Sequence, residues 1–143
     1  MSRHAIPPFH LAFPIRDIEE TRAFYAGLLG CQVGRETSRW IDFDFFGHQL
    51  SAHVRPDELG GAKTGEVDGV AVPVRHFGAI LGWDEFQALA ARLRDAGIRF
   101  ELEPQVRFKG QPGEQATMFF LDPAGNALEF KAFKDPAKVF ARQ

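Results

Sequence analysis

The amino-acid sequence predicts an α+β fold made of two βαβββ modules, with one helix in each half of the chain. Two observations predict it. Apolar residues recur with the period of a strand, then of a helix, then of three further strands, and this order appears twice. The glycine that ends each expected helix also follows the expected N-cap by the same interval, from Asp17 to Gly30 and from Asp84 to Gly97. Such a repeat indicates duplicated modules.

The first module carries clear helix-boundary signals. Asp17 is expected to cap the helix, Glu20 completes a capping box, and Gly30 occupies the position where a helix-ending glycine belongs. Asp42 and Asp44 alternate with phenylalanines along a strand, so we expect them to form a solvated face. The expected strands and helix of this module cover residues 9–13, 17–30, 31–37, 40–46 and 49–54.

The second module repeats the order and is about 11 residues longer, owing to an inserted segment over 106–115. Asp84 and Gln87 are its expected capping pair. Its last two strands are joined by the turn sequence DPAGN at 122–126, which combines proline with residues that tolerate positive φ. The expected strands and helix cover residues 72–81, 84–97, 98–105, 116–121 and 127–133.

The 143 residues are expected to form one domain. Its parts are a first module, a glycine-rich linker, a second module and a polar tail, at 7–55, 56–70, 71–134 and 135–143.

Composition narrows the function classes. A net charge of -2 provides no broad basic field, so we expect no nucleic-acid partner. No apolar run approaches the ~18 residues of a membrane span, and the N-terminus lacks a secretory pattern, so we expect no membrane partner. The single cysteine, Cys31, excludes an internal disulfide. We therefore expect a cytoplasmic protein.

Two histidines and one glutamate stand out as candidate metal ligands. His10 and His76 lie on corresponding strands, and Glu129 lies on the last strand, on the face opposite its apolar neighbours. Two imidazoles and a carboxylate are the ligand set of a facial triad on Fe(II), which we expect here; Mn(II), Zn(II), Ni(II) and Co(II) are the alternatives. Ser51 takes the place of Glu129 in the first module, so three protein ligands are expected. The alternatives are two core histidines and a solvent-facing glutamate.

Four further residues are candidates for catalysis or substrate binding. His48 lies at the start of the strand that carries Ser51, and because a histidine titrates near pH ~6.5 it is a candidate proton carrier. His53, two residues after Ser51 on the same face, is a candidate fourth ligand or a base that acts behind the ligands. Arg107 and Lys109 lie in or beside the inserted segment, whose glycines suit a loop that closes over an anionic group. The alternatives are a strand-end or turn histidine and a purely connective loop.

Taken together, these residues resemble a known family. His10, His76 and the run DPAGNALE at 122–129, with FYAGLLG at 24–30, resemble the vicinal oxygen chelate superfamily over residues 7–134. This group includes glyoxalase I, bleomycin and fosfomycin resistance proteins, and type I extradiol dioxygenases. The resemblance implies two modules packed as a pseudo-twofold, incompletely closed eight-stranded barrel. It also implies a homodimer.

The run from WIDF at 40–43 to RFKG at 107–110 also looks like a small subgroup of that superfamily, described as predicted extradiol-type dioxygenases. This implies non-haem Fe(II) held by His10, His76 and Glu129, with O₂ and a small aromatic or vicinal-diol substrate that chelates the metal. His48 is similar to the acid–base histidine of ring-cleaving members, and Phe119 stands where those members often have a substrate-contacting tyrosine. Two alternatives remain: a glyoxalase-like lyase or isomerase acting on a chelated enediolate, and a metal-free protein that sequesters an aromatic ligand.

Overall fold

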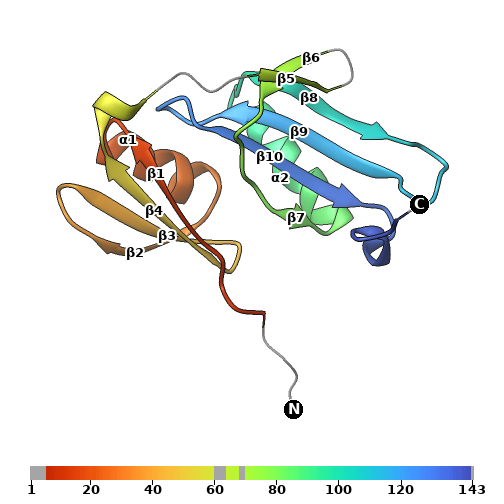
Figure 1. The fold of residues 1–143 in the computed structure, drawn as a ribbon, viewed down its shortest axis with the longest axis horizontal. Coiled ribbons are helices and arrows are strands. Elements are labelled where there is room, and N and C mark those ends of the chain that lie inside the picture. Colours follow the sequence, from red (N-terminus) through yellow and green to blue (C-terminus); the bar gives the residue numbers. More distant parts are fainter. Residues whose placement is uncertain (1–5, 60–63, 68–69, 143) are drawn as a thin grey trace. The chain divides into compact units, whose positions relative to one another are not determined.

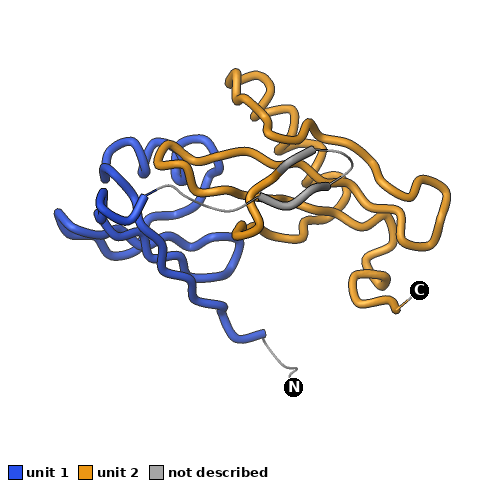
Figure 2. Tube along the Cα trace, turned by 45° about the horizontal axis from the view of Figure 1, so that its top comes forward, with its two compact units in different colours: residues 1–59 blue, residues 60–143 orange. Residues whose placement is uncertain are grey.

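Each half of the chain forms its own four-stranded sheet with a helix against one face (Figure 1). In a computed structural model, residues 6–59, 64–67 and 70–142 are described. The chain divides into unit 1, residues 1–59, and unit 2, residues 60–143 (Figure 2). The strand orders are β1-β4-β3-β2 and β7-β10-β9-β8. In each sheet the first two strands of this order, β1 with β4 and β7 with β10, pair in parallel. The predicted α+β class and repeated βαβββ order are therefore confirmed.

Unit 1 begins its helix at the predicted cap. The Asp17 carboxylate accepts a hydrogen bond of 2.8 Å from the Glu20 backbone N–H, and Gly30 has a φ of 80°. The elements in chain order are β1 (His10–Ile15), α1 (Ile18–Arg22), a π-helical continuation (Ala23–Leu28), β2 (Gln32–Glu36), β3 (Trp40–Phe45), β4 (His48–Val54) and a 3₁₀ turn (Pro56–Glu58).

The core of unit 1 lies between its helix and its sheet. Tyr25 is fully buried, with ring centroids of Phe13 and Phe43 at 5.8 and 5.1 Å. The expectation for the other face of β3 was wrong at Asp42, which is only 7% exposed. It lies opposite Ser51 on β4 and beside Gly34 on β2, where an added Cβ would be 3.4 Å from the Cβ of Asp42. Neighbouring strands therefore cover this carboxylate.

Unit 2 departs from the prediction before its helix. The expected strand over 72–81 is interrupted, because β6 pairs antiparallel with β5 in a separate hairpin and ends at Pro73. The predicted linker thus contains a strand, and His76 lies in the connection between β6 and β7. The elements are β5 (Thr64–Val67), β6 (Val70–Pro73), β7 (Ile80–Leu81), α2 (Trp83–Asp95), β8 (Phe100–Arg107), β9 (Gln115–Leu121), β10 (Ala127–Phe133) and a 3₁₀ turn (Pro136–Lys138).

The cap of α2 also differs from the predicted one. Gly82 is the N-cap, and its backbone N–H donates to the Glu85 carboxylate at 3.3 Å, whereas Asp84 and Gln87 lie inside the helix. The reason is that Glu85 stands three residues after Gly82 and satisfies its otherwise unpaired N–H. Gly97 ends the helix with a φ of 76°, as predicted. α2 packs on β9 and β10 through the expected apolar stripe of Phe86, Leu89, Ala90 and Leu93.

None of the helices in the described ranges is long and apolar enough to cross a membrane.

The turn before β10 forms as its sequence predicts. The Asp122 carboxylate is buried and accepts hydrogen bonds from the backbone N–H groups of Ala124 and Asn126, at 2.9 and 2.8 Å. Gly125 has a φ of 90°. The inserted segment is mostly loop, as predicted: β8 ends at Arg107, residues 108–114 form turns, and β9 begins at Gln115.

Strand register shows that the two histidines occupy equivalent positions. Phe77 pairs in parallel with Leu128, as Leu11 pairs with Leu50 in unit 1. The residue before each, His76 or His10, therefore has the same place relative to the last strand of its sheet. Gly78 permits this pairing, because a Cβ there would lie far inside contact distance of the Glu129 carbonyl oxygen.

We expect Gly78→Ala to lower the free energy of unfolding of the protein by about 3 kcal/mol or more, because backbone must move to admit the methyl group. Urea unfolding monitored by circular dichroism measures this. Gly113→Ala is the control in the same unit: it meets no atom within 4 Å and has an ordinary φ, so a nearly unchanged value is expected. Equal losses in both variants would contradict the close-approach argument.

Candidate metal centre

His76 and Glu129 form a pair in unit 2. The Nε2 atom of His76 lies 3.1 Å from Oε1 of Glu129, and their side chains are 30% and 13% exposed. Glu129 extends from β10 on the face opposite α2, since its neighbours Leu128 and Phe130 are fully buried on the helix side. The alternative of a merely solvent-facing glutamate is therefore not what the structure shows.

Both members of the pair are held by other groups. The Nδ1 atom of His76 lies 2.8 Å from the Pro73 carbonyl oxygen, and the Thr117 hydroxyl donates to Oε2 of Glu129 at 2.5 Å. A carbonyl oxygen can only accept, so Nδ1 carries the proton and Nε2 faces the carboxylate. A proton or a metal ion at Nε2 makes that contact favourable. Outer hydrogen bonds of this kind orient metal ligands.

An aromatic ring borders the pair. Phe119 lies opposite Glu129 on β9, and its ring meets the His76 ring edge-on with a centroid separation of 4.8 Å. Phe119 is 1% exposed and belongs to an apolar cluster with Val72 and Leu102. The structure thus brings Phe119, a predicted substrate-binding residue, next to two of the predicted ligands.

His10 lies in unit 1, and its Nδ1 atom, like that of His76, lies beside a carbonyl oxygen. Its Nδ1 is 2.8 Å from the Gln49 side-chain oxygen, and the residue is exposed. His76 and Glu129 belong to unit 2, so the convergence of all three side chains on one ion stays a prediction. Within either unit, the described residues contain no group of three or more His, Cys, Asp or Glu side chains that could hold a metal.

Ser51, the counterpart of Glu129, does not resemble a ligand. Its hydroxyl is buried and donates to Oδ1 of Asp42 at 2.7 Å. Unit 1 therefore carries a carboxylate on β3, where unit 2 carries Phe119, and a hydroxyl on β4, where unit 2 carries Glu129. Sequence reasoning missed Asp42 because alternation shows which face it shares but not that β2 and β4 cover that face.

Neither predicted catalytic histidine lies beside the His10 imidazole within unit 1. His48 shares the helix-side face of β4 with Leu50, and its Nδ1 accepts a 2.7 Å hydrogen bond from the Phe9 backbone N–H. His53 is on the same face of β4 as Gln49, the residue that contacts His10, but it lies four residues further along the strand, which is about 13 Å from Gln49. His53 is exposed.

The two predicted cations are placed differently. On β8, Gln105 pairs with Thr117 of β9, and Arg107 lies two residues after Gln105. Because side chains alternate along a strand, Arg107 extends from the same sheet face as Thr117. Its guanidinium also lies 4.9 Å from the centroid of the Phe108 ring. Lys109 is exposed in the turn after β8, outside the sheet.

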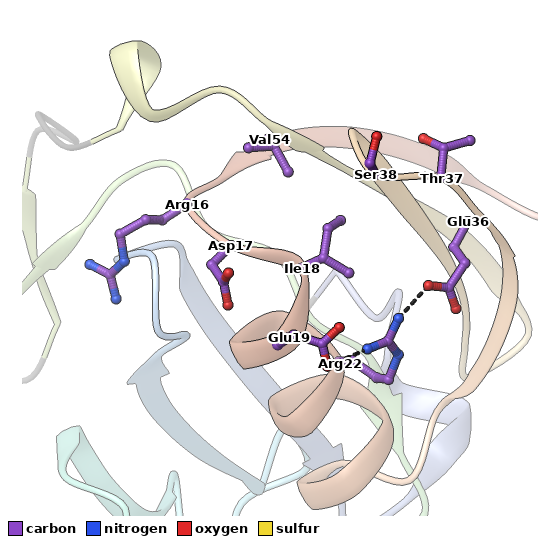
Figure 3. Close-up of a pocket in the computed structure, with 9 residues that line it drawn as sticks. All are labelled: Arg16, Asp17, Ile18, Glu19, Arg22, Glu36, Thr37, Ser38 and Val54. Carbon is purple, nitrogen blue, oxygen red and sulfur yellow. Dashed lines mark hydrogen bonds and ion pairs between the residues drawn. The ribbon is translucent and has the colours of Figure 1, made fainter.

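A surface pocket of about 400 Å³ lies elsewhere, at the start of α1, and none of the predicted site residues lines it (Figure 3). Arg22 within it pairs with Glu19 at 2.7 Å and with Glu36. The hydrogen bond to Glu19, with the neighbouring charges, raises the pKa of Arg22 above its ordinary value despite some desolvation. The guanidinium is thus already neutralised by two carboxylates, and we assign this pocket no role.

The chain matches one protein-family model and is similar to several solved structures. The family model described as the glyoxalase/bleomycin resistance protein/dioxygenase superfamily matches residues 8–130. A glyoxalase/bleomycin resistance protein/dioxygenase from Alicyclobacillus acidocaldarius is 33% identical, with a TM-score of 0.77 over 97% of this chain and 100% of that one. No curated protein sequence matches significantly.

More distant structures share the fold only. A glyoxalase/dioxygenase from Nostoc punctiforme is 16% identical with a TM-score of 0.66, covering 94% of this chain and 100% of that one. A lactoylglutathione lyase from Agrobacterium tumefaciens is 18% identical with a TM-score of 0.62, covering 91% and 96%.

The Thr117–Glu129 hydrogen bond makes a measurable prediction for metal-free protein. Thr117→Val keeps the volume but leaves a carboxylate oxygen unpaired, so we expect the free energy of unfolding to fall by about 1–3 kcal/mol. In a Glu129→Ala background the same substitution should cost much less, which a double-mutant cycle by urea unfolding measures. Strictly additive losses would show that the two side chains do not interact.

Proposed function

Because the chain belongs to the glyoxalase/bleomycin resistance protein/dioxygenase superfamily, we propose that it is a metal-dependent enzyme whose His10, His76 and Glu129 hold one divalent ion. The observation that carries this proposal is the His76–Glu129 pair, with Nε2 and Oε1 facing each other at 3.1 Å. The Pro73 carbonyl oxygen holds Nδ1 of His76, and the Thr117 hydroxyl holds Oε2 of Glu129, so both side chains are fixed in orientation.

The donor set fits a divalent ion. His10 and His76 both have Nδ1 beside a carbonyl oxygen, which leaves Nε2 of each ring as the ligating atom. Two imidazoles and one carboxylate leave coordination positions open, and Ser51 fills none because it is bonded to Asp42. When bound, such an ion supplies Lewis-acid activation to a substrate chelating through adjacent oxygens and, if it is Fe(II), access to O₂.

We propose further that the reaction is an extradiol-type cleavage, by O₂, of a small aromatic or vicinal-diol substrate. The three-ligand set supports this, and the buried Phe119 ring edge-on to His76 makes that side of the pair apolar. Phe119 covers one side of the His76 ring, and Thr117 holds Glu129 in place. Arg107, on the same sheet face as Thr117, would attract an anionic substituent.

Metal content of protein purified without oxygen tests the ligand set. We expect about one ion per chain in the wild type, and a large loss in His10→Ala, His76→Ala and Glu129→Gln. His53→Ala is the control, since it removes an exposed histidine of unit 1 that is not a proposed ligand. A wild type without metal, or a loss in His53→Ala equal to that in His10→Ala, would overturn the proposal.

The reaction is tested on the metal-loaded wild type by oxygen uptake with a panel of catechols. Uptake that requires Fe(II) and is lost in His76→Ala is the expected result. No uptake, together with an isomerase or lyase activity restored by Ni(II) or Co(II), would replace the dioxygenase by an enzyme acting on an enediolate. Binding of an aromatic ligand that survives His76→Ala in metal-free protein would favour a sequestering protein instead.

A further inference from the structure

Unit 1 contains a buried carboxylate that the proposed metal set does not use. Asp42 lies in the middle of β3, on the face opposite the helix, and is 7% exposed. Burying a charge is unfavourable unless hydrogen bonds compensate it. Two side chains of β4 do so: Ser51 donates to Oδ1 at 2.7 Å, and Gln49 donates through Nε2 to Oδ2 at 3.4 Å, a long contact.

The same Gln49 side chain reaches His10. Its Oε1 atom is 2.8 Å from Nδ1 of the His10 ring, across the parallel pairing of β1 with β4. Hydrogen bonds through Gln49 therefore connect the buried Asp42 carboxylate to the exposed His10 imidazole. Only the terminal imidazole is a proposed ligand.

The chemistry of the series permits one direction of donation. An ionised carboxylate can only accept, so the Gln49 amide must turn its NH₂ group toward Asp42. Its carbonyl oxygen then faces His10, and because that oxygen also only accepts, Nδ1 of His10 must carry the proton. Nε2 is left with its lone pair, which is the form that binds a metal.

We propose that Asp42 is a positioning residue for His10, acting through Gln49 to fix the tautomer and orientation of the imidazole. The inference rests on the proposed function only in treating His10 as a ligand. Unit 2 fixes the tautomer of its histidine in another way, because Ala127 stands at the position equivalent to Gln49 and has no side-chain amide. There the Pro73 carbonyl oxygen accepts the Nδ1 proton of His76.

The test reads the His10 tautomer by long-range ¹H–¹⁵N NMR in metal-free protein, well above the usual histidine pKa of about 6.5. We expect wild-type His10 to be protonated at Nδ1, and both Asp42→Ala and Gln49→Ala to give a mixture of tautomers. Adding Asp42→Ala to Gln49→Ala should change nothing more, because the connection is already lost. Gln49 is exposed, so Gln49→Ala remains informative if Asp42→Ala fails to fold.

Asp44→Asn is the matched control on the same strand and face. It removes one negative charge but keeps the oxygen that accepts the Gly47 N–H, so the wild-type tautomer should persist. Titration with Co²⁺ alone gives a second readout, with Kd expected to rise about 10-fold or more in Asp42→Ala.

A His10 ring protonated at Nε2 in the wild type, or a tautomer that is unchanged in either Asp42→Ala or Gln49→Ala, would overturn the inference. Absence of Co²⁺ binding to the wild type, with the expected tautomer pattern intact, would instead defeat the proposed metal function alone.

Discussion

The parallel pairing of the segment around Phe77 with β10 is the constraint on which the candidate site depends. Two backbone hydrogen bonds make it: Phe77 donates to the Ala127 carbonyl at 3.2 Å, and Glu129 donates to the Phe77 carbonyl at 2.8 Å. They fix His76, one residue earlier, beside the Glu129 carboxylate. Gly78 allows the approach because it has no side chain. A backbone interaction thus sets the distance between two side chains of the proposed metal set.

The two units show how a duplicated frame supports different chemistry at equivalent positions. Register aligns His10 with His76 and Ser51 with Glu129. The second unit couples its histidine to a carboxylate and a backbone carbonyl, whereas the first couples its histidine to Gln49 and, through it, to a buried Asp42. In both units the ring atom that remains for a ligand is Nε2. Shared geometry with different supporting groups is expected when the frame fixes positions and local side chains fix protonation.

Much of this arrangement could be predicted from the sequence, because it rests on local signals. The Asp17 cap, the turn at 122–126 and the repeated strand pattern each follow from a few adjacent residues. The break in the expected strand 72–81 could not, because β6 pairs with β5, which lies in a segment without apolar periodicity. The burial of Asp42 could not either, since it depends on contacts across strands. For the same reason, alternation placed Glu129 on the correct face without revealing the Thr117 hydroxyl.

We propose above that one divalent ion binds His10, His76 and Glu129. The most direct measurement of this claim is a crystal structure of the protein grown with Co²⁺, with anomalous diffraction recorded at the cobalt edge. We predict one strong anomalous peak bonded to Nε2 of both histidines and to a Glu129 oxygen, at about 2.1 Å. A peak held by other side chains, or by His76 and Glu129 without His10, would contradict it.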